Sequence, residues 1–372
     1  MIKHNAVNER IKRRYFLFLK EAKRQNESSV DAVAKAVSRF ESYTKYRDFK
    51  AFHFQQAVGF KAHLAQQENL QTGKKLSKAT LNSTLGQLKA FFQWLAMQSG
   101  YKSRINYTDT EYFNLSEKEV RIATARRKTA VPTMEQIKHV IETMPNNSAI
   151  ERRNLSLIAF TLLTGARDSA IASMKLKHVD IVGNSVFQDA REVNTKFSKT
   201  FTTYFFPVGD DIQQIVCDWV RYLKEDLLWG NDDPLFPKTN VIVGDDRVFK
   251  ASGFKREHWR TASPIRTIFK EAFESADLPY FNPHSFRKTI VTLGQKLCQT
   301  PEEFKSWSQN LGHEDVLTTL YSYGEVQQHR QGEIFQQLKS PRSSVNQNVD
   351  DIARAVVKAM ADQNSQMEFK RD

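Results

Sequence analysis

The chain has 372 residues, of which 40% are hydrophobic and 26% charged, and its net charge is +13. This length fits two domains, and the apolar content excludes a wholly disordered protein. No run of 18 apolar residues is present, so we expect no membrane span, and the two cysteines, Cys217 and Cys298, lack metal-binding or redox spacing, which favours a reducing cytoplasm.

The positive charge is concentrated in the first third of the chain. Residues 1–130 contain 25 Lys and Arg against 11 Asp and Glu, whereas the remainder contains 30 against 31. This asymmetry predicts a nucleic-acid partner for the first part, with a merely solvated basic face as the alternative. An acidic membrane is disfavoured because the Phe and Trp residues are needed for a core.

The first hundred residues have the pattern of helices. Between residues 78 and 99, apolar residues recur at steps of four and three, which places them on one helical face: Leu81, Leu85, Leu88, Phe92 and Leu95. Ser77 occupies the expected N-cap position. Earlier helices are expected at about 8–25, 29–46 and 48–67. Three basic residues near the start of the fourth helix are candidates for DNA contact: Lys74, Lys75 and Lys78.

Residues 101–130 are polar and are interpreted as an interdomain linker. Three further candidates for DNA contact lie near its end: Arg126, Arg127 and Lys128. A new helix is predicted after Thr133, where Gln136 completes a capping box. Helices are expected to continue through 149–177.

Strands of a hairpin are predicted at 184–190 and 200–208, because both segments are rich in Val, Phe, Thr and Tyr around a polar centre. Helices return after about residue 210. A second linker is expected at 340–349, followed by a short helix with an apolar stripe: Ile352, Val356 and Met360.

Five features that can perform phosphoryl-transfer chemistry follow one another in the second part. They are Thr164-Gly165-Ala166-Arg167, Lys196, Pro283-His284-Ser285-Phe286-Arg287, Leu311-Gly312-His313 and Tyr323. Two arginines can bind the non-bridging oxygens of one phosphate, and histidines can transfer or share protons. A lysine can protonate a departing alkoxide, and a tyrosine can attack phosphorus. Each feature alone is common on solvated faces or in cores, but their joint order after a basic helical region makes chance a poor explanation.

In these motifs the chain resembles the tyrosine recombinase, or phage integrase, family over about residues 8–335. The resemblance implies an α+β, mainly helical protein with an N-terminal helical, SAM-like core-binding domain and a C-terminal mixed α/β catalytic domain. The corresponding boundaries are 1–115 for DNA binding, 116–132 for a basic linker, 133–340 for catalysis, and 341–372 for a C-terminal linker and amphipathic helix.

The same resemblance implies a role for each motif. It gives Tyr323 as the nucleophile and a phosphate-activating set of five: Arg167, Lys196, His284, Arg287 and His313. The position three after the first arginine, commonly acidic in the family, is Ala170 here. Tyr321 and Lys199 remain as second candidates for the nucleophile and the lysine.

With these residues, the resemblance implies a site-specific DNA recombinase or integrase that cuts and rejoins strands through a 3′-phosphotyrosine, without metal, ATP or another cofactor. Integration and excision of a mobile element is the expected role. The alternatives are an enzyme like a type IB topoisomerase and a non-catalytic DNA-binding descendant of a recombinase. Expected partners are double-stranded DNA, copies of the chain in a homotetramer on synapsed sites, and accessory DNA-bending or directionality proteins. Free protein is expected as a monomer or weak oligomer in the cytoplasm, associated with the nucleoid when bound.

Overall fold

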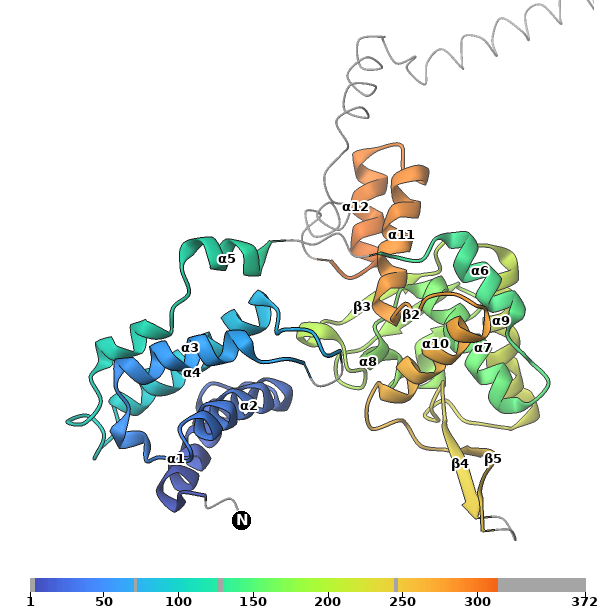
Figure 1. Ribbon diagram of the computed structural model, residues 1–372. Helices are drawn as coiled ribbons and strands as arrows, with labels where there is room; N and C mark the ends of the chain where they lie inside the picture. The colour runs from blue at the N-terminus through green and yellow to red at the C-terminus, as the bar shows by residue number, and fades with distance from the viewer. Residues whose placement is uncertain (1–3, 70–71, 126–129, 244–246, 314–372) are drawn as a thin grey trace, which may run out of the picture. The chain divides into compact units, whose positions relative to one another are not determined.

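A computed structural model describes residues 4–69, 72–125, 130–243 and 247–313 of the chain (Figure 1). The chain forms two compact units, Met1–Arg127 and Lys128–Asp372. Among the described residues, no helix is long and apolar enough to cross a membrane.

Unit 1 is helical. Its helices are α1 (Ala6–Leu17, continued by a π-helical turn), α2 (Glu27–Tyr43), α3 (Phe54–Gln66), α4 (Lys78–Ala96) and α5 (Glu117–Thr124). The four helices predicted for this region are confirmed, although α3 begins later than predicted, after a 3-10 turn. Ser77 caps α4 by accepting a hydrogen bond from the Thr80 backbone amide.

The core of unit 1 is built largely from aromatic rings. The predicted apolar stripe of α4 is confirmed, because each of its five residues is at most 2% exposed. Phe92, one of these five, stacks on Phe52 with ring centroids 4.0 Å apart and meets Phe40 edge-on at 5.1 Å. Offset and edge-on ring contacts of this kind contribute beyond the area that they bury.

Helix α5 lies where the sequence predicted part of a linker. Its start is fixed by a capping box in which the Ser116 side chain bonds the Glu119 amide and the Glu119 carboxylate bonds back. The same carboxylate pairs with Lys78 of α4 at 2.7 Å. The sequence did not predict this helix because α5 buries none of its residues and so its sequence lacks an apolar stripe.

Unit 2 begins with helices around a buried centre. Its first helices are α6 (Met134–Thr143), α7 (Ala149–Thr164) and the one-turn α8 (Asp168–Ile171). The predicted capping box of Thr133 and Gln136 is confirmed. Every residue of α7 from Leu155 to Thr164 is buried. Because α7 is covered on all sides, its C-terminal end is a rigid support for the turn that leads into α8.

A small antiparallel sheet comes next in the chain, in the order β1 (Val179–Asp180), β2 (Ser185–Gln188) and β3 (Phe201–Tyr204). The predicted hairpin is confirmed as β2 and β3, which pair from Ser185↔Tyr204 to Gln188↔Phe201, and both strands are shorter than expected. The later helices are α9 (Asp210–Arg221), α10 (Ser263–Ser275), α11 (Pro283–Leu297) and α12 (Pro301–Asn310).

A second hairpin, β4 (Lys238–Val243) with β5 (Phe249–Lys255), occupies a region where only helices were predicted. It extends away from the helices of unit 2 (Figure 1). Several of its apolar side chains are exposed, including Val243 and Phe249. The alternation that marks a half-buried strand is therefore missing from the sequence, because neither face of the outer hairpin is buried.

Candidate active site

The first arginine follows a glycine that ends α7. Gly165 adopts a left-handed conformation with φ 59°, and a Cβ atom there would lie 2.8 Å from a methyl carbon of Leu311. Only glycine satisfies both conditions without strain. The chain turns sharply at this point and presents Arg167 as the N-cap of α8. Arg167 is half-buried, and burial lowers the pKa of its guanidinium.

The second arginine and the first histidine lie one turn apart on α11. Asn282 caps this helix through a bond from the Ser285 amide. Residues three apart share a helix face, yet their environments differ, because His284 is exposed while Arg287 is 5% exposed. Desolvation, together with the positive charges of Arg287 and Arg167, lowers the pKa of His284. His284 is therefore neutral at neutral pH and able to accept a proton.

Arg287 joins three of the sequence motifs through its own hydrogen bonds. It donates through Nη1 to the Gly165 carbonyl, and through Nη2 to the Leu311 carbonyl at 2.5 Å and to His313 Nε2 at 3.1 Å. A guanidinium has five N–H groups, so these three bonds leave two for a ligand. Motifs that are far apart in the sequence thus meet at one side chain, Arg287.

The electrostatics of this side chain favour an anion. Burial, and then the charge of Arg167, lower the pKa of Arg287 to about 9. Two cationic groups held close together in a partly desolvated place repel each other, and an anion between them relieves that repulsion. The pair is therefore suited to bind the two non-bridging oxygens of a phosphodiester.

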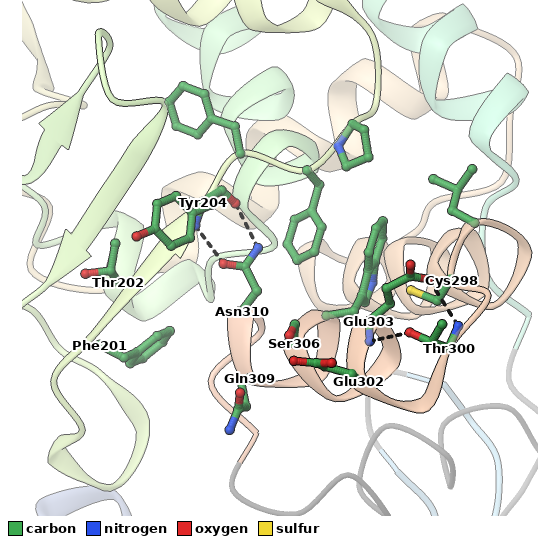
Figure 2. A pocket seen from close by; sticks show the side chains of 15 residues that line it. Phe201, Thr202, Tyr204, Cys298, Thr300, Glu302, Glu303, Ser306, Gln309 and Asn310 are labelled. Carbon is green, nitrogen blue, oxygen red and sulfur yellow. Dashed lines mark hydrogen bonds between the residues drawn. The ribbon is translucent and has the colours of Figure 1, made fainter. Parts of the chain in front are cut away.

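His313 is positioned by a second glycine and by the end of α12. Gly312 has φ 69°, and a Cβ there would lie 2.6 Å from the ring of Phe201. Asn310 fixes the same segment to β3, because its side chain donates to the Tyr204 carbonyl at 2.9 Å and accepts from the Tyr204 amide at 2.7 Å (Figure 2). Sequence reasoning missed Asn310, whose only signal was its position immediately before the Leu-Gly-His motif.

The protonation state of His313 depends on its surroundings. Desolvation and the nearby charges of Arg287 and Arg167 lower its pKa to about 4. The ring is neutral at neutral pH, and because Nε2 accepts from Arg287, the proton lies on Nδ1. His313 can therefore act as a neutral hydrogen-bond donor beside the two arginines.

Lys196 lies in a different environment from the arginines. It is exposed in the turn between β2 and β3, its Nζ atom is 4.7 Å from the centre of the Phe197 ring, and both Phe197 and Ser198 have positive φ. Lys199, which is half-buried, is the lysine whose charge reaches His313 and lowers its pKa. The structure thus brings Arg167, His284, Arg287 and His313 together and leaves Lys196 exposed in a turn.

The base of this turn is nevertheless tied to the first arginine motif. The Asn194 backbone amide donates to the Ser173 hydroxyl at 2.8 Å, and its carbonyl accepts from the Ser169 hydroxyl at 3.3 Å. Both serines come shortly after Arg167 in the sequence. The position of the lysine turn is therefore coupled to that of the arginine although their separation along the chain is large.

Residues 131–330 match the phage integrase family. The chain belongs to this family. Tyrosine recombinase XerC of Lactobacillus delbrueckii subsp. bulgaricus is 22% identical over 262 residues, which are 69% of this chain and 76% of that protein. XerC of Halalkalibacterium halodurans is also 22% identical, over 70% of this chain and 76% of its own. The expectation of a tyrosine-type recombinase is thereby confirmed.

Solved structures show the same fold. The Tn1549 transposon integrase in complex with transposon right end DNA is 13% identical, with a TM-score of 0.58 over 89% of this chain and 99% of that one. A lambda integrase dimer bound to a COC′ core site is 11% identical, with a TM-score of 0.55 over 84% and 94%. The predicted fold class, a helical N-terminal part with a mixed α/β C-terminal part, is confirmed.

Some predicted residues of this recombinase fall outside the part of the chain that the structure describes. They are Tyr323 and its alternative Tyr321, the tail 341–372, and the basic cluster of Arg126, Arg127 and Lys128. Of the other candidates for DNA contact, Lys74 and Lys75 are exposed. Lys78 is paired with Glu119, which partly offsets its charge.

Two hollows lie on unit 2. One, of about 400 Å³, is lined by Arg167, His284 and their neighbours Asp168, Arg266, Asn282 and Pro283. The other, of about 1110 Å³, is a groove between β3 and the helices α11 and α12 (Figure 2). Its lining includes the apolar residues Phe206, Leu297 and Trp307, together with Glu302 and Glu303. The smaller hollow is the candidate for the chemistry, because it is the one of these two that Arg167 and His284 line.

Proposed function

We propose that this recombinase cleaves and rejoins double-stranded DNA at specific sites through a covalent bond between Tyr323 and a 3′ phosphate. The observation that carries the proposal is the convergence on Arg287, which bonds the Gly165 turn, the Leu311 carbonyl and His313. A site with two arginines and two neutral histidines is suited to a phosphodiester anion and to proton transfer beside it.

Arg167 and Arg287 would bind the non-bridging oxygens of the scissile phosphate. Charge on these oxygens is greatest in the pentavalent transition state, so fixed cations there lower the barrier more than they strengthen ground-state binding. His313 would add a neutral hydrogen bond from Nδ1. The bonds that hold Arg287 and His313 exist before DNA arrives, so little reorganisation is needed.

Two protons move in the proposed step. The Tyr323 oxygen bonds to phosphorus while His284 accepts the phenolic proton, and the bond from phosphorus to the 5′ oxygen breaks as Lys196 gives that oxygen a proton. The products are a 3′-phosphotyrosine and a free 5′ hydroxyl. A 5′ hydroxyl of another strand reverses the step. Because the ester conserves the bond energy, the step needs no ATP, and because two arginines supply positive charge at the phosphate, it needs no metal ion. Cleavage should therefore continue in excess EDTA.

A nicked suicide substrate tests the nucleophile. The wild-type protein should accumulate a covalent adduct, Tyr323→Phe should bind the same DNA and form none, and Tyr321→Phe should form it normally. An adduct that survives in Tyr323→Phe and disappears in Tyr321→Phe would reverse the assignment. Transfer of strands between two defined sites separates a recombinase from a topoisomerase-like enzyme, and the absence of any adduct in the wild type would favour a non-catalytic protein.

We also propose the larger setting of this activity. The basic unit 1 would grip DNA with unit 2, and four copies would act on two synapsed sites, aided by accessory DNA-bending or directionality proteins. Integration and excision of a mobile element, in the cytoplasm at the nucleoid, is the role that we favour. DNA sequences flanking the gene should then recombine when supplied as a pair of sites.

The tail 341–372 is proposed to couple assembly to activity by docking in the groove of a neighbouring copy. Its apolar stripe (Ile352, Val356, Met360) matches the apolar lining of the groove. A helix this short needs a surface to be stable. Deletion of 341–372 should leave binding to a single site intact and weaken synaptic complexes in gel shifts. Unchanged synapsis and recombination would reject the docking.

A further inference from the structure

An ion pair borders the smaller hollow, next to Arg167. Asp168 immediately follows that arginine, and its Oδ2 atom accepts a hydrogen bond from Nε of Arg266 at 2.8 Å. Arg266 comes from the first turn of α10, 98 residues away in the sequence. Both residues line the hollow together with His284. A third arginine thus lies beside Arg167, proposed to bind the phosphate, and His284, proposed to accept the tyrosine proton. No motif in the sequence marked it.

The pair fixes the direction of the Arg266 guanidinium. Asp168 is itself held, because its Oδ1 atom accepts from the Ser169 amide at 2.8 Å, and its side chain is 22% exposed. The bond to Asp168 uses Nε, so the outer end of the guanidinium, where each Nη carries an N–H that points away from Cδ, is not used by this pair. Within the described part of the chain these Nη groups have no hydrogen-bond partner, and the Arg266 side chain is 57% exposed.

We propose that Arg266 binds a DNA backbone phosphate next to the scissile one, and that Asp168 is the positioning residue that aims it. This rests on the proposed function, since the scissile phosphate is assigned to Arg167 and Arg287. An arginine held through Nε presents a planar pair of donors, which matches two phosphate oxygens. A lysine has no Nε through which Asp168 could hold it. It would keep the positive charge, but its ammonium group would not be oriented toward the phosphate.

A simple surface ion pair is the competing explanation. Such pairs contribute little to stability, so that explanation gives Arg266 no effect on DNA binding beyond its share of the net charge. Arg221 provides the matched control, because it is similarly exposed at 46% and pairs with Asp218 at 2.7 Å, but lies on α9 and does not line the hollow.

Salt-dependent DNA binding tests the phosphate contact. Arg266→Gln should lower the slope of log K against log salt by about 0.9, the value for one lost phosphate contact, and should weaken specific and non-specific DNA alike. Arg266→Lys should recover the slope but not the full affinity. Arg221→Gln should leave both at wild-type values. An unchanged slope in Arg266→Gln, or an equal change in Arg221→Gln, would overturn the proposal.

A double-mutant cycle tests the role of Asp168. If it acts by aiming Arg266, Asp168→Asn should weaken DNA binding several-fold in the wild-type background and have almost no effect in Arg266→Gln. Equal effects in both backgrounds would reject the positioning role. Covalent adduct formation is measured on the same proteins. If the wild-type protein forms the adduct and Arg266→Gln binds DNA normally, this inference is refuted and the proposed function stands. If the wild-type protein forms no adduct, both are refuted.

Discussion

Arg287 and Lys196 are proposed to act on the same phosphodiester, and the structure holds them in opposite ways. Arg287 is 5% exposed and makes three hydrogen bonds to two other motifs. Lys196 is exposed in a turn with two positive-φ residues, and its ammonium lies over the ring of its own neighbour Phe197. Arg287 is therefore held by other parts of the protein before any substrate binds, whereas the ring contact of Lys196 is with a residue of its own turn.

This difference fits the task proposed for each group. A cation that stabilises charge in the transition state is most effective when it is already oriented, since reorientation would cost free energy during the reaction. A general acid acts on one oxygen as that oxygen departs, so it needs reach more than rigidity. A fixed arginine and an exposed lysine are therefore compatible with one active site.

The largest expected effect comes from replacing the fixed group. Arg287→Lys keeps the charge and loses the fork, so adduct formation should fall by about 10²–10³-fold, and the two unpaired carbonyls should lower the free energy of unfolding by about 1–3 kcal/mol. Arg153→Lys is the control, because Arg153 is also buried and bonds the Pro237 carbonyl at 2.9 Å outside the site. A comparable loss of stability with normal adduct formation is expected there. If both variants lose activity equally, stability alone explains the first result.

Replacing the exposed group should separate activity from stability. Lys196→Ala should slow cleavage by about 10²–10⁴-fold while the free energy of unfolding changes by less than about 0.5 kcal/mol. A substrate with sulfur in place of the leaving 5′ oxygen needs no protonation, and it should restore the rate. Lys199→Ala is the companion variant. If Lys199→Ala is the variant that cleaves slowly and that the sulfur substrate restores, Lys199 is the acid. The contrast between a fixed arginine and an exposed lysine then no longer holds.

The rigidity of the segment that positions His313 can be tested at Gly312. Gly312→Ala places a Cβ 2.6 Å from Phe201 at φ 69°, so it should cost more than conformational strain alone and should slow cleavage by shifting His313. Gly100→Ala, at φ 79° with no atom within 4 Å, isolates the strain, which is about 1–2 kcal/mol. Urea unfolding measures both. Equal losses in the two variants would mean that Phe201 moves aside and that the close approach is unimportant.

The smallest expected effect is on the pH dependence of stability. The pKa of His313 is about 4 in the folded protein and near its ordinary value of about 6.5 in the unfolded chain. Between these values the unfolded chain binds more protons, so the contribution of His313 is fully present above pH 6.5 and is lost as pH falls toward 4. The urea midpoint should therefore decline less over this range in His313→Gln than in the wild type. Parallel curves would contradict the lowered pKa.

The sequence by itself determined the family, the order of the candidate catalytic motifs and the regular helices. Those features are local, since a stripe at helical spacing or a capping box depends on neighbours a few residues away. The α4 stripe and the Thr133 capping box were predicted for this reason. Helix α5 and the β4–β5 hairpin were not, because one buries no residue and the other exposes most of its apolar side chains.

Only the tertiary structure decided how the motifs meet. The contacts of Arg287 with Gly165 and Leu311 span 122 and 24 residues, and the Asp168–Arg266 pair spans 98. No local pattern encodes such pairs, since each depends on where α7, α10, α11 and α12 pack. The same packing decides that one arginine is buried while the predicted lysine is exposed. Charge can be read from a sequence, but the desolvation and hydrogen bonds that give a charge its chemical role arise only when distant segments are brought together.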